Sequence, residues 1–510
     1  MAAWDATRER SLKAGSNNKG DVLYWMARDQ RAADNWALLR AAALAKENGS
    51  KARVVFALGT ITTERRLDFQ LKGLVETGRD LNAKGFAFDL IEVADDAGAA
   101  VAAFATAHEV SHVVCDFSPL REAKQGTKDL VDALPDNIGA SLVDAHNVVP
   151  VWAASPKQEV GARTLRKKIT DQLPRYLKEL PELEAQGPPL QPTVDWRPVI
   201  KAARQKTDRS VTPVDWLTPG SKASLDALEA FCGDGRLKRF AKHRNDPNVE
   251  AASHLSPYLN FGQLSCQRAA LRVREERSKH SESVASFLEE QIVRRELSDN
   301  FCHYQPHYDS LAGAAPWARD SLELHANDTR EHVYGRDALE QAEAAEDVWN
   351  AAQRQLVRQG KMHGFMRTSV WKATGADGTR RKTLMSTQAH VLGEEDSRVD
   401  GVAGRGAGDG AVPERQVLVG WVRPERLRGL RLERHGHARH GLEGARGLRQ
   451  GPLHELQRVQ AQVRRRGLRG RLAEGAAEVH GRLRAAGEEA EEVSVCAPPL
   501  PEVYACKTET

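Results

Sequence analysis

The stretch SHLSPYLN, residues 253–260, combines residue types that could bind a phosphate. Ser256 followed by Pro257 is typical of an N-cap and first turn, so we expect a helix to begin here. The backbone N–H groups of a first helical turn have no intrahelical partner, and they suit a phosphate or pyrophosphate. A capped helix without a ligand is the simpler interpretation of this motif alone.

A second stretch, FLEEQIVRRELSDNF at 287–301, carries carboxylates and guanidinium groups. Its apolar side chains recur at helical spacing and can form one buried stripe, made of Phe287, Leu288, Ile292, Leu297 and Phe301. The other faces of that helix then carry Glu289, Arg294, Arg295 and Glu296. The pattern fits a solvated, salt-bridged helix, or a carboxylate and two guanidinium groups beside a polyanionic ligand.

The third stretch is VWNAAQRQLVRQGKMHGFMR, residues 348–367. An amphipathic helical pattern begins near Trp349 and runs to Arg367, and no helical period follows it. Taken singly, Trp349 fits a core position, and Lys361 and Arg367 fit ordinary surface charge.

The elements that position these stretches differ along the chain. β-branched apolar runs alternate with helical segments in the first part, at residues 22–27, 53–59, 86–93, 110–117 and 139–153. This alternation predicts a Rossmann-like α/β domain over 20–180, with a parallel sheet covered by helices on both faces. No GxGxxG follows the first strand, so the usual dinucleotide fingerprint is absent.

A Pro-rich stretch, LPELEAQGPPLQPTVDWRP, predicts a linker over 181–215. From about 216 the segments are long and 3.6-periodic, which predicts an all-helical domain over 216–367. Residues 1–19 are polar and basic without an apolar signal core, so we predict a disordered leader, with organelle targeting as the alternative.

Composition excludes several classes of protein. The 510 residues are 41% hydrophobic and 28% charged, as in soluble globular proteins. No apolar run approaches the roughly 18–20 residues that span a bilayer. Six cysteines lie without a CxxC pair or Cys/His metal spacing, which predicts a reduced, intracellular chain without a metal site. The net charge of +4 hides a basic tail, because residues 401–490 hold 18 Arg, no Lys and 10 acidic residues.

Four blocks of the sequence together resemble the class II cyclobutane pyrimidine dimer photolyases. They are VLYWMARDQRAADNWALL, HLSPYLNFGQLS, FLEEQIVRRELSDNFCHY, and WNAAQ with GKMHGFMR, and they occur in family order between residue 20 and Arg367. The resemblance implies an α/β domain and a helical domain that binds FAD, and it leaves open whether there is a second, antenna chromophore, whose identity no motif fixes.

The resemblance also implies light-driven DNA repair. Reduced FAD absorbs light and donates an electron to a pyrimidine dimer flipped out of double-stranded DNA, the dimer splits, and the electron returns. We therefore expect a monomeric DNA-repair enzyme of the nucleus, with an organelle as the alternative and no membrane association.

The family's flavin contacts carry over by position. Its flavin-phosphate segment corresponds to Ala252, Ser253, His254, Leu255 and Ser256. Phe240 stands where the family usually has a flavin-contacting Tyr, a departure that loses the hydroxyl and keeps the ring. Lys361 and Arg367 fall among the flavin contacts. Trp349 corresponds to one member of the tryptophan chain that reduces the flavin, and a core role is compatible with it.

The family's DNA-contacting residues also correspond to positions in this sequence. Arg244 corresponds to a DNA-contacting Arg, and Glu289 to the carboxylate that holds the dimer and helps to stabilise its radical anion. The DNA-facing helix corresponds to Glu289, Glu290, Gln291, Ile292, Val293, Arg294, Arg295, Glu296 and Leu297.

The resemblance stops after Arg367, where the family continues with motifs such as MYWAKKILEWT. When the possible codons of residues 390–400, HVLGEEDSRVD, are read one base later, they permit MYWAKKILEWT, and later segments permit further family motifs in family order. We interpret residues from about 390 onward as an out-of-frame reading, and 368–388 as an insertion from a retained intron or a sequence error. A diverged tail and an RNA-binding Arg/Gly tail are the competing explanations. The 368–510 segment is then not native-like, and we expect the chain as written to bind FAD poorly.

Two other functions compete with repair. A flavin blue-light photoreceptor would share the architecture, but Glu289 and the class II blocks favour repair. An RNA-binding protein would use the Arg-rich tail, yet that tail lacks RGG repeats and interleaved aromatic residues.

Overall fold

The computed structural model describes residues 4–16, 19–61, 63–324, 334, 336–364 and 366. The predictions for Arg367 and for the 368–510 segment lie outside these residues. Among the described residues, no helix has both the length and the apolarity that a membrane crossing requires.

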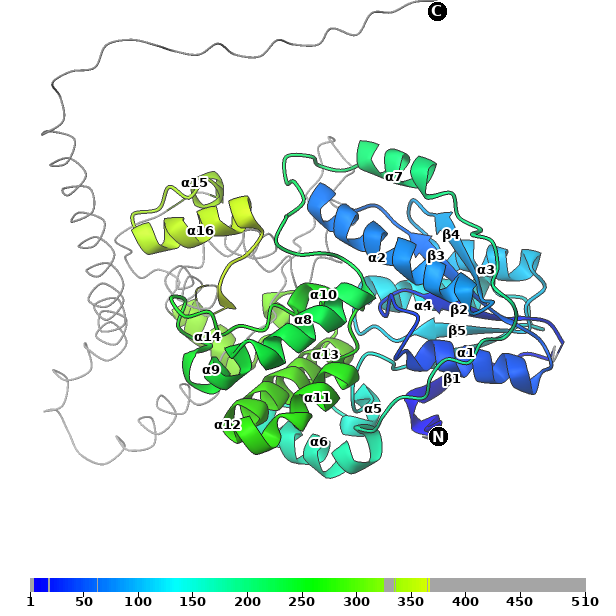
Figure 1. Cartoon of the computed structure of the whole chain (residues 1–510), viewed down its shortest axis with the longest axis horizontal. Coiled ribbons are helices and arrows are strands. Elements are labelled where there is room, and N and C mark those ends of the chain that lie inside the picture. The colour runs from blue at the N-terminus through cyan, green and yellow to red at the C-terminus, as the bar shows by residue number, and fades with distance from the viewer. Residues whose placement is uncertain are drawn as a thin grey trace, which may run out of the picture. The chain divides into compact units, whose positions relative to one another are not determined.

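A six-stranded sheet forms the first part of the chain (Figure 1). Its strands, in the order β1-β6-β5-β2-β3-β4, are β1 (Glu9–Lys13), β6 (Gly139–Val143), β5 (His112–Asp116), β2 (Val22–Met26), β3 (Ala52–Leu58) and β4 (Ala87–Glu92). All pairings are parallel except that between β1 and β6. The predicted α/β fold is confirmed, with an antiparallel edge strand added to the parallel sheet.

The prediction of a disordered leader is wrong for residues 4–16. β1 pairs with β6, with Glu9 opposite Val143. Just before the strand, Arg8 is buried and donates to the carbonyl oxygens of Asp144, Asn147 and Val148. A polar, basic segment is thus ordered because backbone pairing and carbonyl acceptors satisfy its polar groups.

Helices cover both faces of the sheet because successive strand residues point to opposite sides. Tyr24 and Met26 of β2 lie in one core cluster with α1 (Trp36–Glu47) and α2 (Glu64–Ala83). Leu23 and Trp25 lie in the other cluster, with α3 (Ala97–Ala107) and α4 (Arg121–Ala133). Two helices follow β6, namely α5 (Val151–Ala154) and α6 (Ala162–Tyr176).

The predicted linker runs back along the α/β part. Gln186 exchanges hydrogen bonds with the backbone of Ala52 at the start of β3. Trp196, the first residue of α7 (Trp196–Gln205), stacks on Phe88 of β4 with ring centroids 6.1 Å apart. This segment therefore adds a layer to the sheet domain.

The second part of the chain is helical (Figure 1). Its α-helices are α8 (Ser221–Gly233), α9 (Arg236–His243), α10 (Ser256–Asn260), α11 (Cys266–Glu275), α12 (Arg277–Leu288), α13 (Arg295–Tyr304), α14 (Pro316–Leu324), α15 (Arg336–Glu340) and α16 (Asp347–Gln359). A cluster of buried aromatic rings, including Phe231, Phe240 and Phe287, holds α8, α9 and α12 together.

Candidate functional site

Between α12 and α13 the chain makes a π-helical turn, η2 (Glu289–Arg294). A π turn shifts the register of the side chains that follow, and such turns are frequent at functional sites. Glu289 lies at its start and accepts hydrogen bonds from Arg166 of α6 at 2.9 and 2.7 Å and from Arg294 at 3.0 Å. The bonds from Arg166, ahead of the opposing effect of burial, hold the pKa of the Glu289 carboxyl below its usual value. Two guanidinium groups therefore hold this carboxylate ionised.

The neighbouring Glu290 points to a different partner. Its Oε1 lies 3.6 Å from Nη2 of Arg244, the residue that ends α9. The Arg244 guanidinium also lies over the ring of Phe240, 5.6 Å from the centroid. The structure thus brings Arg244 and Phe240 together, and it pairs Arg244 with Glu290, whereas the described partners of Glu289 are Arg166 and Arg294.

Burial corrects the prediction that the whole 289–297 segment faces DNA. Four of its side chains are buried, namely Gln291, Ile292, Val293 and Glu296. Ile292 and Val293 belong to the core cluster and Glu296 is bonded to the backbone of Val148 and Val149, so burial places these side chains away from a surface that could contact DNA. Arg295 and Leu297 are half-buried, and Arg295 donates to the carbonyl of His146 at 2.7 Å.

The expected flavin-phosphate segment forms a bend before α10. Ser256 is the first residue of that five-residue helix and Leu255 precedes it without a side-chain capping bond, so Ser256 is not the N-cap that we predicted. His254 has a left-handed backbone, with φ of +60°, which is uncommon for a residue with a side chain. Its Nε2 is bonded to Glu250 and lies 3.2 Å from Nζ of Lys361.

A second cation approaches the same bend. Arg236, at the start of α9, directs Nη1 toward the carbonyl oxygens of Ala252 and Ser253, 3.4 Å from each. The Lys361 ammonium lies 5.5 Å from the ring centroid of the half-exposed Trp216. The structure therefore brings Lys361 to the 252–256 segment, which the family resemblance also assigns to the flavin. It adds Arg236, which sequence reasoning missed.

Trp349 lies in α16 and is buried, with 5% of its surface exposed. Its indole Nε1 has no hydrogen-bond partner among the described residues. Buried Trp N–H groups usually find a partner.

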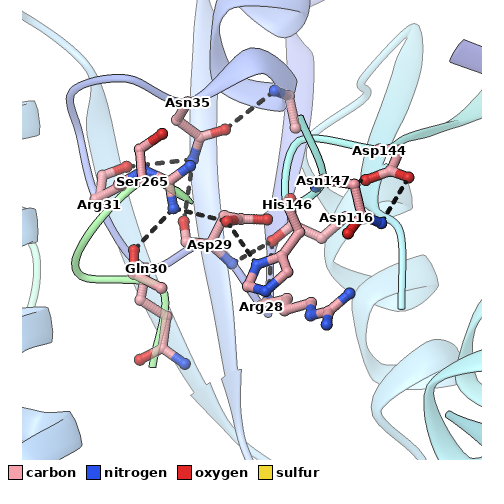
Figure 2. A network of polar contacts seen from close by, with 12 residues as sticks. Arg28, Asp29, Gln30, Arg31, Asn35, Asp116, Asp144, His146, Asn147 and Ser265 are labelled. Carbon is pink, nitrogen blue, oxygen red and sulfur yellow. Dashed lines mark hydrogen bonds and ion pairs between the residues drawn. The ribbon is translucent and has the colours of Figure 1, made fainter. Parts of the chain in front are cut away.

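The loop after β2 joins the α/β and helical parts through a network of polar contacts, which sequence reasoning missed (Figure 2). Arg28 donates to both carboxylate oxygens of Asp299 in α13, at 2.7 and 2.9 Å. Arg31 donates to Asp29 and to the carbonyl of Gly262, which follows α10. Asp29 in turn contacts His146 at 3.2 Å. The signal that could have revealed this contact is the run of polar residues, RDQRAAD, directly after a buried strand.

Burial shifts the titration of this network. It lowers the pKa of His146 to about 3, so this imidazole is neutral near pH 7. It opposes ionisation of Asp29 as well, but Arg31 and His146 outweigh it and hold the pKa of Asp29 well below its usual value. For Glu296, burial raises the pKa to about 8, although its Oε1 accepts the backbone N–H groups of Val148 and Val149. The network thus combines buried ion pairs, such as that of Asp29 with Arg31, with a neutral His146 that is held by its hydrogen bond to Asp29.

Two further observations limit the chemistry. The described residues contain no group of three or more His, Cys, Asp or Glu side chains that could hold a metal ion. Of the six cysteines the structure describes four, and all four are buried thiols without a disulfide.

Comparisons with known proteins agree with this architecture. A family model described as DNA photolyase matches residues 22–186. The chain is 46% identical over 379 residues to a deoxyribodipyrimidine photo-lyase of Arabidopsis thaliana, covering 71% of this chain and 75% of that one. It is 44% identical over 356 residues to a protein of the same name from Potorous tridactylus, covering 68% of this chain and 65% of that one.

Solved structures show the same fold at low identity. A class III photolyase of Agrobacterium tumefaciens aligns with a TM-score of 0.56 and 19% identity, over 77% of this chain and 82% of that one. A cryptochrome of Synechocystis aligns with a TM-score of 0.55 and 16% identity, over 71% and 76%. The identity to curated relatives over most of their length establishes that this chain belongs to the DNA photolyase family.

Proposed function

We propose that this protein is a deoxyribodipyrimidine photo-lyase, a carbon–carbon lyase that uses light to split cyclobutane pyrimidine dimers in double-stranded DNA. The curated relatives at 44–46% identity carry that name. The observation that carries the proposal is the placement of Arg244 beside both Glu290 and the ring of Phe240. A blue-light photoreceptor without repair activity is the rival, and no observation favours it.

The donor set around residues 252–256 fits an anionic cofactor such as FAD. Two cationic side chains, Arg236 and Lys361, approach this bend, and both are at least partly shielded from solvent. Cations that are partly desolvated bind phosphate oxygens more strongly than fully exposed ones. When bound, reduced FAD would supply the photochemical electron. The identity of an antenna chromophore stays open.

The side chains of this chain would act on DNA and on charge. Arg244 would bind a backbone phosphate next to the lesion. Glu290 would form the hydrogen bond to the dimer, and Arg166 and Arg294 would keep Glu289 ionised behind it. This assignment moves the lesion contact from Glu289, which the family resemblance indicated, to its neighbour, because Glu289 is already held by two guanidinium groups. Trp349, buried in α16, would serve as one relay in reduction of the flavin.

The reading-frame interpretation belongs to this proposal. Residues from about 390 onward would be the out-of-frame translation of a photolyase segment, so that the chain as written lacks part of its flavin pocket. The protein would act on DNA as a monomer. A retained intron would mean that the gene is eukaryotic, and the enzyme would then work in the nucleus.

A repair assay on two chains tests the proposal. The chain with the frame restored, purified with FAD, should reverse dimers in an oligonucleotide under near-UV or blue light and not in darkness. Dimer reversal is read from recovered absorbance near 260 nm, and the absence of light-dependent reversal in a flavin-loaded protein would refute the proposed function.

A further inference from the structure

We propose that the loop 156–161 and the first half of α6 form a second DNA-contacting surface on the α/β part of the protein. This surface, which we call the α6 surface, consists of Lys157, Val160, Arg163, Arg166 and Lys167. The inference rests on the proposed function, because it extends the DNA contact beyond Arg244 and the π turn.

The charge of the α6 surface fits a polyanion. Residues 156–168 contain five basic side chains and one acidic side chain, Glu159. Glu159 is buried and bonded to Lys168, so it does not offset the exposed cations. Lys157, Arg163 and Lys167 are exposed. Lys167 pairs with Asp171 one turn later at 2.6 Å, but both side chains stay in solvent, 83% and 58% exposed, so this surface ion pair is weak. Arg163 and Lys167 lie four residues apart and therefore share one face of α6.

The loop that leads into α6 is fixed against the helical part. Tyr304 donates to the carbonyl of Ser155 at 2.7 Å. Asn300, which is fully buried, accepts from the backbone N–H of Glu159 at 2.8 Å and donates to the carbonyl of Lys157 at 3.1 Å. These bonds hold Val160 in solvent with 91% of its surface exposed. A surface that is fixed before binding loses less conformational entropy when a ligand docks.

A chain of ion pairs connects the α6 surface to the predicted lesion contact. Arg166, three residues after Arg163, bonds Glu289, and the same carboxylate accepts from Arg294. The next residue, Glu290, pairs with Arg244. The α6 surface is thus continuous with the side chains that we place at the dimer. A duplex seated on Arg244 would present its backbone phosphates to cations along this line.

Residue-resolved lysine labelling of the full chain tests the inference. Acetylation is measured by peptide mass spectrometry, with and without a short duplex that carries one thymine dimer. Lys157 and Lys167 should be protected severalfold, and Lys242 of α9 should be protected with them. Lys46 is the control, because its 80% exposed side chain matches Lys167 and lies in α1, away from the α6 surface. The readout is specific to each lysine, so DNA held by the Arg-rich tail does not obscure it.

A pair of matched variants gives an independent readout. The double variant Arg163→Gln, Lys167→Gln should bind DNA with a smaller salt dependence. The slope of log affinity against log salt concentration should fall in magnitude by about 1 to 2, because each lost phosphate contact reduces it by about 0.9. The control is Arg197→Gln with Lys201→Gln, which makes the same substitutions four residues apart on the exposed side of α7. The control should leave the salt slope unchanged.

The outcomes separate the two proposals. Protection of Lys242 without Lys157 and Lys167, or equal salt slopes for the two double variants, would overturn the α6 surface and leave the repair function standing. Protection of none of the three lysines would overturn both. Protection of Lys157 and Lys167 by polyglutamate but not by the duplex would assign the surface to an acidic protein and overturn the inference.

Discussion

Arg166 in the α/β part donates two hydrogen bonds, of 2.9 and 2.7 Å, to the carboxylate of Glu289 in the helical part. This ion pair joins α6 to the π turn, and the next carboxylate, Glu290, lies beside Arg244 instead. Two adjacent acidic residues therefore have different surroundings. Their roles can be separated by experiment.

In the frame-restored chain, Glu290→Gln should lower the repair efficiency at least about tenfold, because a hydrogen bond to a charged group contributes roughly 1.5–3 kcal/mol. Glu289→Gln should mainly lower the free energy of unfolding, by about 1 kcal/mol after solvent screening of the half-exposed Arg166. Repair per bound flavin and urea unfolding measure the two effects. The reverse order of repair losses would return the lesion contact to Glu289.

Gly262→Ala should destabilise the folded protein by about 2 kcal/mol or more. Gly262 has φ of +64°, and a Cβ there would collide with the carbonyl oxygen of Arg28 and lie 2.6 Å from Cα of Asp29. Gly233→Ala is the control, since no atom lies within 4 Å of its added Cβ. Urea unfolding of both variants should show a loss at position 262 only, and equal stabilities would mean that the two parts do not pack this closely.

Arg28→Gln should cost about 3–5 kcal/mol of stability, because it leaves the Asp299 carboxylate buried without its charged partner. The Arg28 and Asp299 side chains are 15% and 8% exposed. Arg79→Gln breaks an ion pair whose side chains are 72% and 41% exposed, and it should change the midpoint of thermal unfolding little. Similar shifts in the two variants would contradict the buried contact.

Glu296 should make the protein lose stability as the pH rises. Its pKa is about 8 in the folded chain against a usual value of 4.5, so the folded state binds more protons between these pH values. The contribution of Glu296 to the free energy of unfolding is then largest below about pH 4.5. It falls toward pH 8 by at most about 1.4 kcal/mol per pH unit. Glu296→Gln should flatten that part of the stability curve, measured by urea unfolding from pH 5 to 8. An unchanged slope would show that Glu296 is already ionised.

The 510-residue chain should bind FAD in well under one equivalent, whereas the frame-restored chain should bind one equivalent. The reason is that the out-of-frame segment cannot complete the flavin pocket. The absorbance near 450 nm, compared with the protein concentration, measures the ratio. A stoichiometric flavin spectrum from the 510-residue chain would contradict the reading-frame interpretation, as would a transcript that cannot encode MYWAKKILEWT in the next frame.

Sequence alone determined the strands and the helical class of the second part, because these depend on local periodicity. The five apolar runs correspond to β2 to β6, and β2, which is buried along its whole length, is apolar at every position, as a strand covered on both faces must be. The resemblance to the photolyase family likewise predicted the flavin segment and the DNA-contacting role of Arg244 without any coordinates.

Tertiary structure decided which polar groups meet. Periodicity placed Glu296 on a solvated face, but the π turn and the packed α/β part bury it, and backbone N–H groups of residues 148 and 149 bond one of its two carboxyl oxygens. The polar sequence before Asp21 gave no sign of a strand, because β1 depends on backbone pairing with β6 rather than on an apolar pattern. Equally, nothing in the letters EE shows that Glu289 pairs with Arg166 and Glu290 with Arg244. Hydrophobic periodicity is a local property of the chain, whereas these charge pairs join residues that are distant in the sequence, 123 positions apart for Arg166 and Glu289 and 46 for Arg244 and Glu290.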